Sequence, residues 1–102
     1  MARRMYRQGD LLFVKVDSLP KRFRRVDSDV VHRGEASGHS HRLIGGRIYR
    51  NYWNTEETFI VVDSVGKVVH EEHGEIILEK GVWMVVRQRE YSPQTGFEYV
   101  IE

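Results

Sequence analysis

The sequence predicts an all-β fold, a small antiparallel barrel or sandwich of about seven to nine short strands. Hydrophobic residues recur with a period of two along most of the chain, and many of them are β-branched or aromatic. Both properties are typical of half-buried strands. Turn-forming residues separate these segments regularly, at Gly45-Gly46, Gly66, Gly74, Gly81 and the pair Pro93 and Gly96.

The expected strands follow one another along the chain: Leu11–Val16, Val30–His32, Arg47–Trp53, Thr58–Val62, Lys67–His70, Glu75–Leu78, Val82–Tyr91 and Phe97–Ile101. At most one short helix is expected, near residues 18–26. Ser18 suits its N-cap, and Leu19, Phe23 and Val26 would share one face. An irregular basic loop is the alternative for this segment, because an isolated helix of that length is marginal.

Length and composition indicate a single β domain over residues 1–102. The 102 residues include 40% hydrophobic ones, enough for one modest core. The longest apolar run, Val82–Val86, is too short to span a membrane, and no apolar region follows the basic start as it would in a signal peptide. The chain has no cysteine, which fits a reducing compartment, so we expect a cytoplasmic location.

The formal net charge of +1 conceals two oppositely charged halves. Residues 1–50 hold 12 Lys or Arg and 5 Asp or Glu, a balance of +7, whereas residues 51–102 hold 4 and 10, a balance of −6. Such asymmetry indicates either an anionic partner for the first half or packing of unlike faces between copies of the chain.

Histidine placement is the most informative feature of the sequence. His39 and His41 are separated by one residue, so on a strand both point to the same face and can chelate one ion. His70 and His73 flank a segment that ends at Gly74, where a hairpin corner would bring both imidazoles to one side. The four histidines, His39, His41, His70 and His73, are therefore candidate ligands for Zn²⁺, Ni²⁺, Mn²⁺ or Fe²⁺, with zinc first.

Two other interpretations of the histidines stay open. They can be solvated turn residues without a metal, or they can contact a substrate or nucleic acid directly. His32 lies on an apolar strand, where a structural role is expected.

The glycine-flanked pair in Gly38-His39-Ser40-His41 resembles the first metal-binding motif of the cupin superfamily. This resemblance implies a β-barrel whose metal is held by the two histidines, a following glutamate and a later histidine, for which His70 or His73 is available. No glutamate follows His41 at the expected interval, where Arg42-Leu43-Ile44-Gly45 stands instead. The chain as a whole also resembles small phage and prokaryotic proteins without assigned activity, through its segments 7–10 and 87–91.

A metal at these histidines would have one of two roles. A closed site with four histidines would be structural, whereas an open site would lower the pKa of a bound water and activate it for hydrolysis of an anionic substrate. Glu71, Glu72 and Glu35 are the candidate catalytic bases, although each is also typical of a solvated turn carboxylate.

A second group of residues is basic and aromatic, and it suits single-stranded nucleic acid. Cations neutralise phosphates, and aromatic faces stack on bases. The candidate contacts are Lys21, Arg22, Arg24, Arg25, Arg47 and Tyr49. A solvated charged surface is the alternative interpretation of this group.

The leading hypothesis is a histidine-rich, transition-metal-binding β protein that acts as a metal-dependent hydrolase on a phosphodiester or other anionic substrate. The alternatives are a non-catalytic β-barrel that binds single-stranded nucleic acid, and a structural or assembly subunit of phage origin that forms a homo-oligomer.

Overall fold

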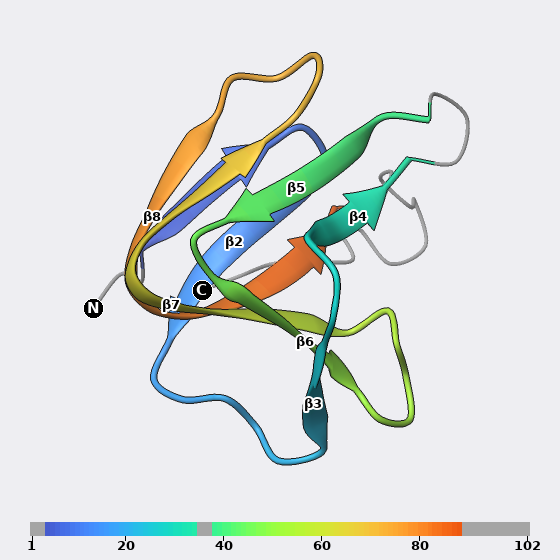
Figure 1. The fold of residues 1–102 in the computed structure, drawn as a ribbon, viewed down its shortest axis with the longest axis vertical. Helices are drawn as coiled ribbons and strands as arrows, with labels where there is room; N and C mark the ends of the chain where they lie inside the picture. Colours follow the sequence, from blue (N-terminus) through green and yellow to red (C-terminus); the bar gives the residue numbers. More distant parts are fainter. Residues whose placement is uncertain (1–3, 35–37, 89–102) are drawn as a thin grey trace, which may run out of the picture.

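The computed structural model describes residues 4–34 and 38–88, and it confirms the all-β prediction. This part of the chain holds eight strands, all paired antiparallel, and no helix; the sheet curls into a half-barrel (Figure 1). The strands are β1 (Met5–Gln8), β2 (Leu11–Val16), β3 (Phe23–Val26), β4 (Val30–Arg33), β5 (Ser40–Ile44), β6 (Arg47–Asn51), β7 (Thr58–Val69) and β8 (Ile76–Arg87). No helix in the described residues is long and apolar enough to cross a membrane.

The strand order is β1-β2-β8-β7-β5-β4, with β6 pairing both β7 and β3. The long strand β7 therefore has two partners on one side. Its first residues, 58–61, pair with β6, and its last residues, 67–69, pair with β5. In the same way, β3 pairs with β6 and β4 pairs with β5. Each of the segments 23–33 and 40–51 thus contributes two strands, one on either side of a bend near its middle.

The second of these bends depends on Gly45. Its φ is +83°, a conformation that residues with a Cβ rarely adopt, and an added Cβ would lie 2.5 Å from the carbonyl oxygen of Val65. The close approach brings the β5–β6 turn onto the middle of β7, where the pairing of β7 with β8 is irregular between Val62 and Val65. The β5–β6 turn therefore lies at the same position along the sheet as the irregularity in β7 and β8. The sheet curls there around a concave interior (Figure 1).

The bend also explains two errors in the predicted strand boundaries. Gly66 and Gly81 were expected to mark turns, but they lie inside β7 and β8. Thr58–Val62 and Lys67–His70 merge into one strand, as do Glu75–Leu78 and the first part of Val82–Tyr91. Glycine inside a strand weakens the strand locally and permits a tight bend. At Gly66 and Gly81 the strand therefore continues through the glycine and does not end there.

The core fills the concave side of the sheet. Trp83 and Phe13 are fully buried there, next to Ile60, Leu78 and Val68. The indole Nε1 of Trp83 donates to the carbonyl of Glu79 at 3.0 Å, so the one polar atom of this side chain has a partner. The buried cluster draws on β2, β4, β5, β6, β7 and β8, and it therefore holds both ends of the sheet together.

Three elements differ from the sequence-based expectation. The helix considered for residues 18–26 does not form; residues 23–26 pair with β6 as β3 instead, because Phe23 packs edge-on against Phe59 at 4.7 Å. Strands β1 and β5 were not expected, since their sequences are largely polar. The expected strand Phe97–Ile101 lies outside the described residues.

We predict that Gly45→Ala lowers the free energy of unfolding by about 1–3 kcal/mol, because the new Cβ meets a backbone oxygen and the backbone conformation is strained. Urea denaturation followed by circular dichroism measures the change. Gly74→Ala is the matched control, since an added Cβ there has no heavy atom within 4 Å. Equal stability of the two variants would contradict this role of Gly45.

Candidate metal centre

The four histidines predicted from the sequence lie together in the structure. The ring centroids are 4.4 Å apart for His41 and His70, 4.6 Å for His70 and His73, and 5.6 Å for His39 and His70. We call His39, His41, His70 and His73 the histidine cluster. His39 and His41 come from the start of β5, and the other two from the corner between β7 and β8. That corner lies at residues 70–75, where Gly74 predicted it.

His41 is the buried member, and its orientation is fixed by Gln8. Nε2 of Gln8 donates to the carbonyls of Val68 and Gly74 at 2.9 and 3.0 Å, so its Oε1 must accept. This oxygen lies 2.7 Å from Nδ1 of His41. His41 therefore carries its proton on Nδ1, and Nε2 keeps a lone pair. Burial is the main reason that the pKa of His41 falls to about 4, and the ring is neutral near pH 7.

Asp10 faces that lone pair. Its Oδ1 lies 3.5 Å from Nε2 of His41, while its Oδ2 lies 3.5 Å from Nε of Arg87. A neutral imidazole with its proton on Nδ1 and a carboxylate are both acceptors at this contact, so neither satisfies the other. A cation bound by both groups would satisfy them together.

Sequence reasoning missed both Gln8 and Asp10. Asp10 follows a glycine in a turn, where an aspartate is common, and no local pattern distinguishes a buried glutamine from a solvated one. A signal was present in Gly9 between them: its φ is +59°, and an added Cβ would lie 2.7 Å from Nε2 of His73. The β1–β2 turn therefore lies against the histidine cluster, and a side chain at position 9 would require the His73 ring to move.

The glutamates of the β7–β8 corner bind the more exposed histidines. Oε1 of Glu72 lies 2.8 Å from Nδ1 of His39, which favours a proton on Nδ1 and leaves Nε2 of that ring as an acceptor. The backbone N–H of Glu72 donates to Nδ1 of His70 at 3.0 Å, so His70 carries its proton on Nε2. Oε1 of Glu71 accepts the backbone N–H of Ser40 at 3.0 Å, and this bond lowers the pKa of Glu71.

These contacts determine which of the predicted residues offer an unprotonated nitrogen or a free carboxylate to a metal ion in this structure. Within residues 4–34 and 38–88, no three or more His, Cys, Asp or Glu side chains are arranged to hold a metal ion. His39 and His41 present unprotonated Nε2 atoms, whereas His70 presents a protonated one. Among the predicted bases, Glu71 accepts the N–H of Ser40, Glu72 lies against His39, and Glu35 lies outside the described residues.

The predicted nucleic-acid contacts lie on the paired strands β3 and β6 and in the turn before β3, and Arg25 of β3 stands opposite Tyr49 of β6. Arg24 and Arg25 lie on β3, next to the turn that holds Lys21 and Arg22. Arg47 on β6 donates to both carboxylate oxygens of Asp63 and, at 3.4 Å, to the hydroxyl of Tyr49. Arg47 is therefore already bound to Tyr49 and to an acidic residue.

An aromatic feature that the sequence did not single out lies beside β3. The guanidinium carbon of Arg24 lies 4.0 Å from the ring centroid of Tyr52, whose centroid is 5.5 Å from that of Trp53. Tyr52 is 58% exposed and Trp53 77% exposed. We call Arg24, Tyr52 and Trp53 the aromatic platform.

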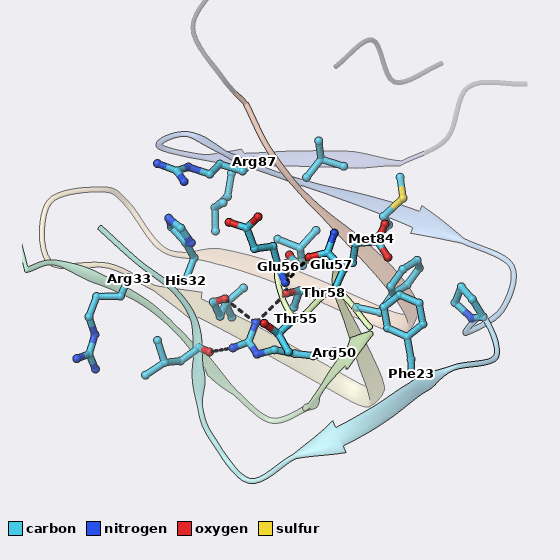
Figure 2. A pocket seen from close by; sticks show the side chains of 18 residues that line it. Phe23, His32, Arg33, Arg50, Thr55, Glu56, Glu57, Thr58, Met84 and Arg87 are labelled. Atoms are coloured by element: carbon cyan, nitrogen blue, oxygen red, sulfur yellow. Dashed lines mark hydrogen bonds between the residues drawn. The ribbon is translucent and has the colours of Figure 1, made fainter. Parts of the chain in front are cut away.

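A cavity of about 860 Å³ opens beside β4, whose residues form part of its lining (Figure 2). Apolar residues of β2, β3, β4, β7 and β8 form its walls, and the half-buried Arg50 of β6 lies in the middle of the residues drawn in Figure 2. His32, which stands opposite His41 in the β4–β5 register, also lines this cavity. We call it the Arg50 pocket.

Comparison with known proteins identifies one family. Residues 7–88 match the model described as Domain of unknown function (DUF8820). The chain belongs to this family. No cupin or phage family was identified. No curated protein matches the chain, and no solved structure matches it.

The DUF8820 match includes every residue of the site described above. It begins at Arg7 and ends at Gln88, so it contains Gln8, Asp10, the histidine cluster and the residues that line the Arg50 pocket. Both features therefore lie inside the family's domain and not in an extension of it.

We predict that Gln8→Leu lowers the free energy of unfolding by about 2–5 kcal/mol, because two buried carbonyls and one imidazole N–H lose their partner. Gln88→Leu is the matched control: the side-chain oxygen of Gln88 accepts a hydrogen bond from Arg7 at an exposed position, and a change within about 0.5 kcal/mol is expected. Urea denaturation of the two variants measures both values. A cost for Gln8→Leu no larger than that of the control would contradict this assignment.

Proposed function

We propose that this protein binds one divalent transition-metal ion at the histidine cluster, with Zn²⁺ the first candidate. The observation that supports the proposal is the meeting of four imidazoles from two separate segments, with ring centroids 4.4–6.5 Å apart for the adjacent pairs. Neutral imidazole is the side chain that such ions bind most often. His41 and Asp10 add a pair of facing acceptors that a cation would bridge.

The surroundings of two histidines also suit this role. Metal-binding histidines almost always donate their second ring N–H to a carbonyl or carboxylate, which fixes the ring and its tautomer. Gln8 provides this for His41, and Glu72 provides it for His39. His70 would have to exchange its bond with the N–H of Glu72 for the metal, so a modest rotation of the corner side chains accompanies binding in this proposal.

Hydrolysis is not part of the proposal. Glu71 and Glu72 accept hydrogen bonds or pair with His39 in the metal-free protein, and a lowered pKa makes Glu71 a weaker base. A metal that organises the β1–β2 turn, β5 and the β7–β8 corner fits these contacts better than a metal that activates water. The proposed role is therefore that of a metal-binding domain.

Metal content and affinity test the proposal. Protein purified without a metal-affinity tag is expected to contain about one metal ion per chain by elemental analysis, and added Zn²⁺ should raise the melting temperature of the metal-free protein. His39→Ala and His73→Ala should each weaken zinc binding in calorimetry by about 100-fold or more, and Gln8→Leu by about 10–100-fold.

His32→Gln is the control for this series, because His32 is the one histidine outside the predicted ligand set. Zinc affinity should be the same in this variant as in the wild type. Two results would overturn the proposal: a melting temperature unaffected by Zn²⁺, Ni²⁺ and Mn²⁺, or zinc binding that survives loss of both His39 and His73.

The aromatic platform supports a second candidate function, binding of single-stranded nucleic acid. Two adjacent aromatic rings are exposed there beside a cation, and Arg22 and Arg25 flank Arg24 in the sequence. Bases stack on such rings with little dependence on sequence, and the cations neutralise phosphates. This candidate needs no metal and uses residues remote in sequence from the histidine cluster.

We predict that Trp53→Ala weakens binding of an oligothymidine by about tenfold, since stacking is worth about 1–3 kcal/mol per base. Fluorescence anisotropy at several salt concentrations measures it, and the affinity of the wild type should fall steeply as salt rises. Val65→Ala, which removes another exposed apolar side chain, serves as control and should bind like the wild type. Absence of binding at low salt would eliminate this candidate.

A further inference from the structure

The Arg50 pocket has the size and composition of a small-molecule site. Its volume of about 860 Å³ falls in the range of about 300–1,000 Å³ typical of ligand pockets. The walls are mainly apolar: Leu11, Phe23, Val31, Phe59, Met84 and Val86. Such pockets bind an apolar body and use a few polar groups to orient it.

Arg50 is the half-buried cation beside these walls, and within residues 4–34 and 38–88 its hydrogen bonds go to uncharged partners. Nη1 donates to the hydroxyl of Thr58 at 2.7 Å and to the carbonyl of Val31 at 3.3 Å, and Nη2 donates to the carbonyl of Val30 at 2.7 Å. The two carbonyls belong to successive residues, which in a regular strand point in opposite directions. The irregular register of β4 between Val30 and His32 explains how both reach one guanidinium.

Within the described residues, these bonds leave N–H groups of Arg50 without an acceptor and its positive charge without an ion-pair partner. A guanidinium has five N–H groups, and Arg50 uses three of them. Among residues 4–34 and 38–88, Nε of Arg50 has no acceptor and no carboxylate forms an ion pair with it. Burial lowers the pKa of Arg50, and no nearby anion offsets that effect. A half-buried cation in this state gains from an anion that enters the pocket.

The rim of the pocket carries both signs of charge. Arg33 and Arg87 lie at the periphery of the residues in Figure 2, and Glu56 and Glu57 are exposed on the loop before β7. Glu57 already accepts a hydrogen bond from Asn51, and Arg87 already pairs with Asp10. Among the charged residues that line the pocket, Arg50 is half-buried and the other four are exposed.

We propose that the Arg50 pocket binds a small amphiphilic carboxylate, with its carboxylate on Arg50 and its apolar chain or ring against Phe23, Phe59 and Met84. Carboxylate oxygens match the planar fork of a guanidinium better than a single-point anion does. The pocket shares no residue with the histidine cluster, although His32 on its wall lies 6.3 Å from His41 between ring centroids. The proposal does not require a metal at the cluster.

Two ligands with the same tail test the proposal. Isothermal titration calorimetry of the metal-free protein compares decanoate with decylammonium, which differ in the charge of the head group. Decanoate should bind at least about tenfold more tightly, because its carboxylate accepts charge-assisted hydrogen bonds from Arg50. Arg50→Met should remove this preference, because decanoate loses its partner cation and decylammonium loses a repelling one.

A second variant keeps the test decisive, because Arg50 also ties β6 to β4 and its loss can destabilise the fold. Met84→Trp fills the pocket and leaves Arg50 in place, so it should weaken decanoate binding about tenfold or more while the circular dichroism spectrum is unchanged. Equal affinities of the wild type for the two ligands would overturn the proposal. So would undiminished decanoate binding by folded Met84→Trp.

Discussion

The shared bend of the strands is the constraint on which the rest of this structure depends. A flat sheet of these strands would have no interior for Trp83 and Phe13. Because β7 pairs with β5 at one end and β6 at the other, the sheet folds over at the level of Gly45. Because of the bend, the two candidate sites lie on different parts of the sheet. The histidine cluster lies where β5, β7 and the β7–β8 corner meet, and the Arg50 pocket lies where β4, β6 and the end of β8 meet.

Gln8 connects the first strand to that arrangement. One buried amide bonds with the end of β7, with the β7–β8 corner and with His41 of β5, so four segments share a single side chain. The same contact sets the tautomer of His41, so Nε2 is the ring nitrogen that keeps a lone pair. Stability and the chemistry of the cluster are thus coupled through one residue.

The sequence predicted much of the fold and part of the site, for reasons visible in particular residues. Alternating apolar residues identified the strands, and the spacing of His39 and His41 with the corner at Gly74 placed the four imidazoles together. The bends were missed because Gly66 and Gly81 have the same local signature in a bend as in a turn. Asp10, Gln8 and Arg50 were missed because their partners are distant in sequence: Gln8 bonds to Val68, and Arg50 to two carbonyls released by an irregular register in β4.

The pairing of β2 with β8 has a kinetic consequence. Residues 11–16 pair with residues 82–87, whereas most other strand pairs join neighbours in the chain. Closing a loop of that length costs chain entropy before its contacts form, so β2 docking is expected to be a late step in folding. As the ribosome makes the chain, the β1–β2 hairpin emerges before β8 and must wait for it. Until then one side of β2 and the apolar face of Phe13 stay uncovered, the period when association between nascent chains is most favourable.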